Sequence, residues 1–455
     1  MITINHLPLE IITEIVSYLP RKDRLACSQV SSLWNRAVDC RQLWKFMLVY
    51  LDSDLAGRYA SRSQRWYVNV QASDPTTAII TKMYHKHLLT IELCWSSFPV
   101  PARGILHDFR QYCKKACEYL TLLLNLCVQL RSIKISTWSD VPCLKKVTYH
   151  LCKFLRSQLH LVEVSFFNVD FCVVESARLM ACLRSFTDVS RLEIIHCDHP
   201  NPLPHWRSSF DSLKCLQVLK VDYALLNGGL MDSLLRQKVA SLKCIEMIVG
   251  EMDDLRRCIP EESWRDLCEQ CPMMRVGLHI KNRCSDLGEL LCEAIPLTVF
   301  TLTCGKASDQ TRGGHLQNIL SSMIRIYHRT LEKVYVQLNN NTETVDETLT
   351  AIVTRCSRLK FFEFHGNVGS VETLRKICEI QAGMEEKSKS SRDGNLKRNR
   401  LLGFKRFSIV AKNMNFYSHR LFQTLHRDFG RKFRDADIQF RTSGCSNKNL
   451  VYIYY

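Results

Sequence analysis

Apolar residues return along most of the chain in a short pattern, L-x-x-Φ-x-Φ, where Φ is an apolar residue. Its eleven copies begin at Leu88, Leu130, Leu161, Val189, Leu216, Leu242, Met273, Leu297, Leu331, Leu359 and Phe404. From the second copy to the tenth, the spacings are 31, 28, 27, 26, 31, 24, 34 and 28 residues. The alternating positions predict a short strand, and stretches such as 176–186 and 345–356 have the periodicity of a helix. Because one strand and one helix cannot close a core alone, the pattern predicts stacked strand–helix repeats.

The spacing lies around the period of leucine-rich repeats. It predicts an α/β fold, a curved solenoid with parallel strands on its inside and helices on its outside. A generic α/β domain remains the alternative, because the spacings vary by ten residues and no regular asparagine or cysteine ladder follows the strands.

In such a solenoid, the residue between the last two apolar positions of each repeat points to the concave surface. These residues are Lys134, Ser165, Glu193, Lys220, Glu246, Gly277, Thr301, Tyr335, Glu363 and Ser408. Their charges are mixed, which suits a protein or peptide partner better than a phosphate backbone. They therefore form the predicted surface for a bound target, although each one alone is as well explained as a solvated strand residue.

A different pattern opens the chain. The apolar residues of 7–20 are Leu7, Leu9, Ile11, Ile12, Ile15, Val16 and Leu19. From Ile11 onward their spacing places them on one face of a helix. Pro8 suits a first helical turn and Pro20 ends the segment, so the stretch predicts a helix of about three turns.

Two more helices are predicted in the next thirty residues or so. Asp23 can cap the second, whose apolar face would carry Ala26, Val30 and Trp34 at four-residue intervals. Residues 40–48 predict the third, with Leu43, Trp44 and Met47 as apolar positions. Three short helices bury their apolar faces poorly among themselves, so part of this surface is expected to meet a partner.

The order of residues from Leu7-Pro8 through Glu10-Ile11, Ile15, Tyr18-Leu19-Pro20, Asp23, Val30-Ser31 and Trp34 to Leu43-Trp44 resembles the F-box motif. The resemblance implies docking to the adaptor Skp1 and, through it, to cullin-1 and a RING subunit of a ubiquitin ligase. The positions that match the motif, as core or adaptor-facing surface, are Leu7, Pro8, Ile11, Ile12, Ile15, Leu19, Leu25, Val30, Trp34 and Trp44. Segments of the second half, such as 262–280 and 329–364, extend the resemblance to F-box proteins with leucine-rich repeats. It implies a receptor that selects a target protein for ubiquitination and proteasomal degradation.

These patterns predict five parts of the chain. They are an F-box at 1–50, a linker at 51–86, a leucine-rich-repeat solenoid at 87–383, a basic polar loop at 384–400, and a last repeat with a C-terminal helix or cap at 401–455. The closing segment 413–441, charged and aromatic, is the predicted helix.

Positive charge gathers at the end of the chain. The formal net charge is +17, and residues 384–455 hold 16 Lys and Arg against 6 Asp and Glu. A basic segment can bind nucleic acid, an acidic membrane surface or an acidic protein, or be a solvated loop. A nucleic-acid-binding repeat protein is thus one alternative, although the aromatic interleaving of a known module is missing. A Skp1-bound scaffold without a ligase role is another.

Catalytic and metal chemistry are not predicted. The 22 cysteines are scattered, often within apolar runs, as reduced buried thiols would be. Cys113 and Cys117, and the C-x-x-C pair Cys268 and Cys271, lack the second pair that a structural zinc needs. Phosphate-binding, zinc-protease and serine-hydrolase motifs are missing, so neither a cofactor nor an active site is expected. The sequence shows no signal peptide and no membrane-spanning stretch, which predicts a cytoplasmic or nuclear protein.

Overall fold

The computed structural model describes most of the chain. The described residues are 7–51, 67–95, 106–138, 144–169, 173–195, 210, 212–237, 240–251, 253, 255, 258–282, 287–304, 315–338, 340, 343–370, 372–380, 406–412, 423–425, 427–431, 439–446 and 449–450. Contacts between Cα atoms divide the chain into two compact units, Met1–Lys220 and Val221–Tyr455. Within the described part, no helix has the length and apolar character needed to cross a membrane.

The first unit begins with short helices. These are α1 (Leu9–Ser17), α2 (Arg21–Cys27), α3 (Ser32–Val38) and the 3₁₀ helix η2 (Arg41–Trp44). The helix predicted for 7–20 is present as α1. The second predicted helix is wrong in its extent, because it breaks into α2 and α3. Asp23 lies inside α2, and the cap belongs to Ser31, whose side chain accepts a hydrogen bond from the Trp34 backbone N–H at 3.3 Å.

The third predicted helix, 40–48, is also wrong. A single 3₁₀ turn, η2, is followed directly by the strand β1 (Phe46–Tyr50). The strand buries Met47 and Val49, and Trp44 precedes them at the spacing of the repeat pattern. Trp44 therefore stands where the other repeats have leucine, so this stretch is the first strand of the sheet.

The sheet of the first unit is parallel. Its strands are β1 (Phe46–Tyr50), β2 (Tyr67–Gln71), β3 (Thr90–Cys94), β4 (Ser132–Trp138), β5 (Glu163–Val169) and β6 (Arg191–Ile195). Their spatial order is β2-β1-β3-β4-β5-β6. β7 (Val218–Asp222) lies at the boundary between the two units.

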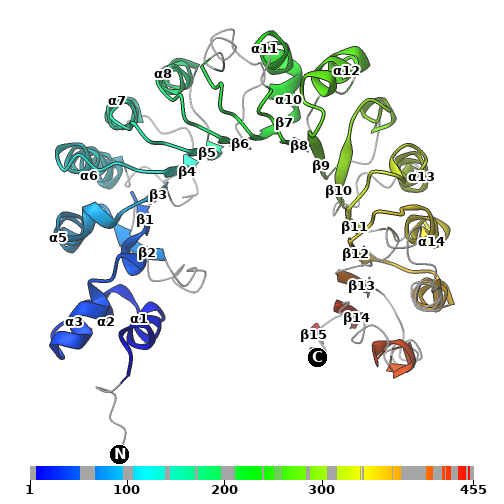
Figure 1. Cartoon of the computed structure of the whole chain (residues 1–455), viewed down its shortest axis with the longest axis horizontal. Coiled ribbons are helices and arrows are strands. Elements are labelled where there is room, and N and C mark those ends of the chain that lie inside the picture. The colour runs from blue at the N-terminus through cyan, green and yellow to red at the C-terminus, as the bar shows by residue number, and fades with distance from the viewer. Residues whose placement is uncertain are drawn as a thin grey trace, which may run out of the picture. The chain divides into compact units, whose positions relative to one another are not determined.

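The helices of the first unit lie along one side of these strands (Figure 1). They are α5 (Pro75–Tyr84), η4 (His85–His87), α6 (Leu106–Asn125), α7 (Leu144–Arg156) and α8 (Val173–Leu183). The stretch 51–86, interpreted from the sequence as a linker, thus contains β2 and α5.

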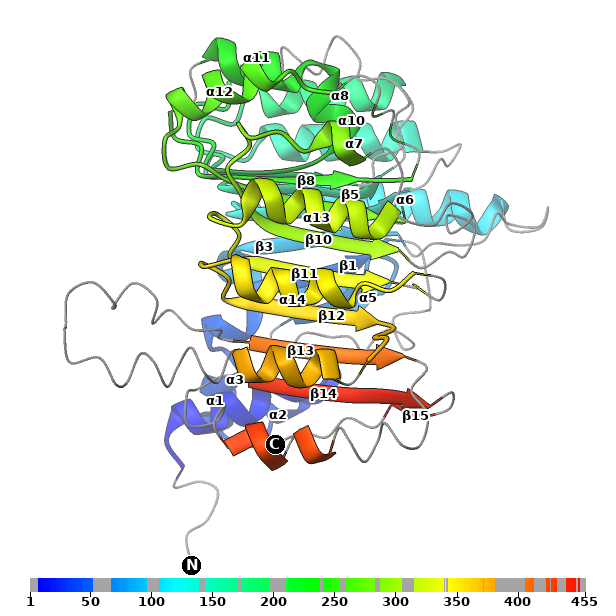
Figure 2. The same ribbon diagram turned by 90° about the vertical axis from the view of Figure 1, so that its right-hand side faces the viewer.

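The second unit repeats the arrangement. Its strands are β8 (Cys244–Val249), β9 (Arg275–Lys281), β10 (Leu297–Cys304), β11 (Lys333–Leu338), β12 (Phe361–Gly366), β13 (Arg406–Lys412), β14 (Gln439–Ser446) and β15 (Asn449–Leu450). They pair in chain order, parallel as far as β14, and β15 is antiparallel to β14. Figure 2 shows β10 to β14 in this order. Its helical elements are α10 (Tyr223–Leu225), the π-helical turn η5 (Leu226–Leu230), α11 (Met231–Gln237), α12 (Glu261–Gln270), η6 (Leu287–Leu290), α13 (His315–Tyr327) and α14 (Asp346–Arg355).

The core lies between strands and helices. The apolar positions of the repeats pair across neighbouring strands, as Ile133, Val164 and Leu192 do, and all three are fully buried. Burial of apolar surface at about 25 cal/mol per Å² is the main stabilising contribution in such a layer. The predicted α/β architecture, parallel strands with helices alongside, is confirmed in both units.

The C-terminal part differs from the sequence prediction. In segment 413–441, predicted as a helix, the described residues form two short helical segments, 423–425 and 427–431, and from Gln439 the strand β14. The apolar pattern does not predict β14, because its second apolar position is a threonine: Thr442 pairs with Ile409 of β13. The basic loop predicted for 384–400 lies outside the described residues.

Candidate functional site

The apolar residues of helix α1 form two rows, one buried and one exposed. Ile12 and Val16 are fully buried against the neighbouring helices, whereas Ile11 is 47% exposed and Ile15 is 36% exposed. Tyr18, at the end of the helix, is 67% exposed. A single stripe in the sequence therefore supplies both the core of the helical domain and an apolar surface.

The other predicted F-box positions divide in the same way. Pro8 and Val30 are exposed, and Leu7, Leu19 and Leu25 are half-buried. Trp34 and Trp44 belong to the interior. The apolar surface of the helical domain, called here the F-box surface, consists of Pro8, Ile11, Ile15, Tyr18 and Val30.

A buried arginine fixes the shape behind this surface. The Arg24 guanidinium donates to the backbone carbonyls of Ser17 at 2.9 Å, Leu19 at 2.9 Å and Leu43 at 3.2 Å. Burial lowers the pKa of Arg24 from its ordinary value. Because these carbonyls lie at the C-terminal end of α1 and in η2, the Arg24 side chain links the first helix of the domain to its last. No sequence pattern indicates this role, since Arg24 is one of several basic residues in the polar stretch 21–24.

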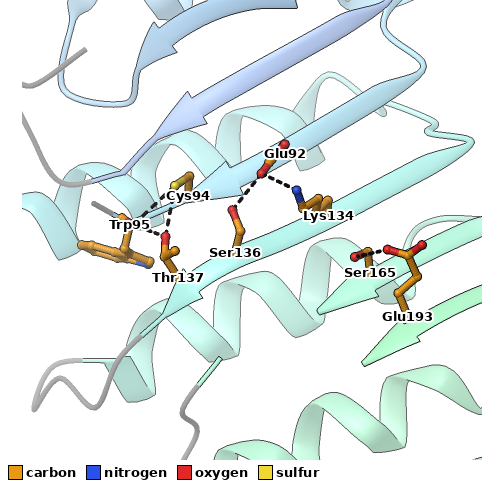
Figure 3. A network of polar contacts seen from close by, with 8 residues as sticks. All are labelled: Glu92, Cys94, Trp95, Lys134, Ser136, Thr137, Ser165 and Glu193. Carbon is orange, nitrogen blue, oxygen red and sulfur yellow. Dashed lines mark hydrogen bonds and ion pairs between the residues drawn. The ribbon is translucent and has the colours of Figure 1, made fainter. Parts of the chain in front are cut away.

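The second candidate surface is the open face, meaning the strand side chains on the side without described helices. In the first unit, Lys134 of β4 lies between Glu92 of β3 and Ser165 of β5 in register. The Glu92 carboxylate pairs with Lys134 Nζ at 2.9 Å and accepts a hydrogen bond from Ser136 Oγ at 2.9 Å (Figure 3). Glu92 was missing from the predicted set, although it holds the same place between Ile91 and Leu93 of the first repeat.

Farther along the same face, Ser165 Oγ donates to the Glu193 carboxylate at 3.1 Å, and Arg191 donates to its other oxygen at 2.9 Å. The predicted residues Lys134, Ser165 and Glu193 are thus brought together in one row. Their charges are largely paired within the row. Lys134 Nζ also lies 5.6 Å from the ring centre of Phe167, which is 37% exposed.

At the carboxyl ends of β3 and β4 lies a smaller network. Cys94 Sγ and Thr137 Oγ1 are 3.1 Å apart, and both side chains hydrogen-bond to the backbone carbonyl of Trp95 (Figure 3). The Trp95 and Trp138 rings meet edge to face at 5.9 Å. These contacts tie the strand ends together beside the open face.

In the second unit, Thr301, Tyr335 and Glu363 lie side by side on β10, β11 and β12, as predicted, and Ser408 of β13 is opposite Glu363 in register. Toward β9 the pairing departs from the repeat pattern. An irregularity between Leu297 and Val299 shifts the register, so that Thr301 is opposite His279 and Gly277 is opposite Val299.

This shift gives His279 polar neighbours. Its Nδ1 is 3.1 Å from Thr301 Oγ1, and its Nε2 is 3.8 Å from a carboxylate oxygen of Glu246. A second histidine, His365, lies 2.8 Å from the Glu363 carboxylate, and its ring centre is 5.6 Å from that of Tyr335. Sequence spacing gives His279 no partner, because the strand register that brings it to Thr301 cannot be read from spacing.

Lys220, the remaining predicted residue of this surface, is half-buried on β7. The C-x-x-C cysteines lie at the end of α12. Burial raises the pKa of both Cys268 and Cys271, and Cys268 Sγ donates to the backbone carbonyl of Ala294 at 3.5 Å. Burial thus favours the protonated form of both thiols.

Fold and surfaces together define a protein with a small helical domain followed by strand–helix repeats. Residues 4–49 match the protein family described as F-box-like, and the chain therefore carries an F-box-like domain at its N-terminus. F-box/LRR-repeat protein 12 of Bos taurus is 24% identical over 162 residues, which is 35% of this chain and 44% of that protein. The match thus spans less than half the length of this relative.

Among solved structures, the crystal structure of a TLR13–ssRNA13 complex is similar at 10% identity and a TM-score of 0.27, covering 66% of this chain and 38% of that chain. Segments 262–280 and 329–364 also resemble F-box only protein 39 and its relatives, and this finer likeness is a prediction from the sequence alone.

Proposed function

We propose that this protein is the substrate-recognition subunit of an SCF-type E3 ubiquitin ligase. In this proposal the F-box-like domain docks to Skp1, and the repeats bind a target protein that is then ubiquitinated and degraded by the proteasome. The observation that carries the proposal is the F-box surface, where Ile11, Ile15 and Val30 are exposed on a domain that matches the F-box-like family.

Exposed apolar side chains on one helix face, as Ile11 and Ile15 are on α1, are typical of an interaction site. A docked partner would remove them from water and gain about 25 cal/mol for each Å² of apolar surface buried. The buried neighbours Ile12 and Val16 keep α1 in place without the partner, so the surface is formed before docking.

Target binding is assigned to the open face. Side chains of both charges, together with Tyr335 and Phe361, offer polar and aromatic contacts of the kind found in protein interfaces. We infer no catalytic role for the chain. Ubiquitin transfer would belong to the RING subunit and its E2 enzyme, reached through cullin-1. The chain would act by raising the effective concentration of the target beside them.

The test is co-purification of the full chain with Skp1 and cullin-1. One variant carries Ile11→Ser and Ile15→Ser. The matched control carries Ile79→Ser and Met83→Ser on α5, which are also exposed and four residues apart, at 58% each. We expect the wild type and the control to retain both partners and the α1 variant to lose them while its unfolding transition is unchanged.

Other outcomes identify the rival functions. Skp1 without cullin-1 in the wild-type complex would favour a scaffold outside the ligase. If the wild type binds neither protein, the adaptor function is wrong, and a salt-sensitive interaction of residues 384–455 with nucleic acid becomes the function to test.

A further inference from the structure

The open face of the second unit is hollowed at β10, β11 and β12. The hollow has a volume of about 210 Å³. The side chains around it that the argument uses are Val299, Lys333, Tyr335, Phe361 and Glu363. They come from adjacent register positions, with Val299 opposite Lys333 and Lys333 opposite Phe361, so three neighbouring strands build one site. These strands lie next to one another in Figure 2.

The size of the hollow favours a side chain over a free small molecule. Sites for drug-sized ligands and cofactors usually enclose about 300–1,000 Å³. This hollow is smaller, and it is open toward the strand surface, along which a peptide can run. Val299 and Phe361 are half-buried and supply apolar walls. One apolar side chain of a bound peptide therefore matches its volume and its lining.

The two charged side chains at the hollow differ in whether another charged or ionisable group contacts them. Glu363 is engaged by His365, at 2.8 Å. Lys333 is exposed, and its Nζ lies 5.1 Å from the ring centre of Phe361, but within the described part of the chain it has no ion pair. The hollow therefore offers one cation held over an aromatic ring. It complements a peptide that places an anion beside its apolar side chain.

A carboxylate suits this cation better than a phosphate. A phosphorylated side chain carries a charge of about −1.5 to −2 at neutral pH and is usually held by several cations. Here Glu363 lies on the strand next to Lys333 and would repel a second negative charge. The chain's own 384–400 stretch matches this cation less well, because its net charge is positive, with six Lys and Arg against three Asp and Glu.

We propose that the hollow binds an acidic peptide segment of the target protein. An apolar side chain of the segment enters between Val299 and Phe361, and a neighbouring Asp or Glu pairs with Lys333. The inference rests on the proposed function for the existence of a target, and it adds the chemistry by which the target is recognised.

The experiment uses three fluorescein-labelled heptapeptides with a central leucine, flanked on both sides by glutamate, glutamine or lysine. Binding to the full chain is followed by fluorescence anisotropy. We expect the glutamate peptide to bind about fivefold more tightly than the glutamine peptide, the effect of an exposed ion pair of ~1 kcal/mol. The lysine peptide should bind most weakly. Lys333→Glu should reverse this order, and Phe361→Ala should weaken the binding of all three by about tenfold.

The matched control is Lys376→Glu, which makes the same charge change at an exposed lysine of the helical segment 372–380 and should leave the order as in the wild type. Three results would each overturn the proposal. They are an order of peptide affinities that Lys333→Glu leaves unchanged, a preference of the wild type for the lysine peptide, and no binding of any peptide.

Co-purification with Skp1 separates this proposal from the adaptor function. Lys333→Glu should retain Skp1 whether or not the peptide order reverses. Loss of Skp1 by the wild type, with the peptide order as expected, would remove the adaptor function and leave the acidic-peptide site in place.

Discussion

The rings of Trp44 and Tyr84 lie face to face, with centroids 3.8 Å apart and planes inclined by 4°. Trp44 ends the helical domain at η2, where its Nε1 donates to the Val38 carbonyl at 2.6 Å, and Tyr84 is the last residue of α5. Burial raises the pKa of Tyr84, and the nearby Asp39 carboxylate adds to the shift. The stacked pair thus joins the F-box-like helices to the first helix that covers the sheet.

Trp44→Ala should therefore destabilise the first unit as a whole. Removing a buried tryptophan costs about 3–5 kcal/mol, and a stacked aromatic pair adds about 1 kcal/mol to simple burial. We expect this loss in the free energy of unfolding measured with urea. Tyr84→Phe, which keeps the ring, should lose less than about 1 kcal/mol. Equal losses in the two variants would show that the phenol oxygen, and not the stacked rings, provides the stabilisation.

The second prediction concerns Arg24, whose side chain links α1 to η2. Arg24→Ala would leave the carbonyls of Ser17, Leu19 and Leu43 without their donor in a buried place, so we expect a loss of about 3 kcal/mol or more. Arg24→Lys should recover only part of it, because one ammonium cannot reproduce the geometry of a guanidinium.

The matched control for this link is Arg36→Ala, on the exposed side of α3, which should change stability by less than about 0.5 kcal/mol. The measurement is urea unfolding followed by far-ultraviolet circular dichroism. An Arg24→Ala variant as stable as the control would show that the three carbonyls find water or another donor.

The repeats were predictable because their pattern is local. In each copy the strand needs only two apolar residues two apart, and burial of pairs such as Val164 and Phe166 follows directly from that alternation. The pattern failed where the residue type changed. Trp44 replaced leucine before β1, and Thr442 replaced an apolar residue in β14, so both strands were missed.

The candidate surfaces were predictable only in part, since they depend on relations between distant residues. Ile11 and Ile12 are equivalent in a periodicity plot, yet the packing of α1 against α2 and α3 buries one and exposes the other. Likewise, alternation placed Thr301 on the open face, but the irregularity before Val299 decided that its neighbour is His279. Neither outcome has a signature in a single stretch of sequence.

The third prediction concerns the stability of the protein at alkaline pH, which depends on the buried phenol of Tyr119 in α6. Its hydroxyl donates to Met47 Sδ at 3.2 Å and lies 3.3 Å from Thr81 Oγ1, and burial raises the pKa of Tyr119 to about 12. A phenol in the unfolded chain titrates near ~10. Between these two values the unfolded state holds fewer protons than the folded state, so the free energy of unfolding falls as pH rises. The stabilisation is complete below about pH 10 and is lost toward about pH 12.

For one group the loss approaches ~1.4 kcal/mol for each pH unit within that window. We therefore expect Tyr119→Phe to be less stable than the wild type at about pH 9, because the contacts of the hydroxyl are lost. The gap should narrow by ~1.4 kcal/mol at about pH 11, since phenylalanine does not titrate.

The measurement is urea unfolding at both pH values under reducing conditions. Tyr149→Phe is the control, because this tyrosine is 60% exposed and its phenol meets water in the folded and the unfolded chain alike. A gap between the wild type and Tyr119→Phe that stays constant from about pH 9 to about pH 11 would mean that the folded protein releases this proton as readily as the unfolded chain. The site formed by Tyr119, Met47 and Thr81 would then have to admit water.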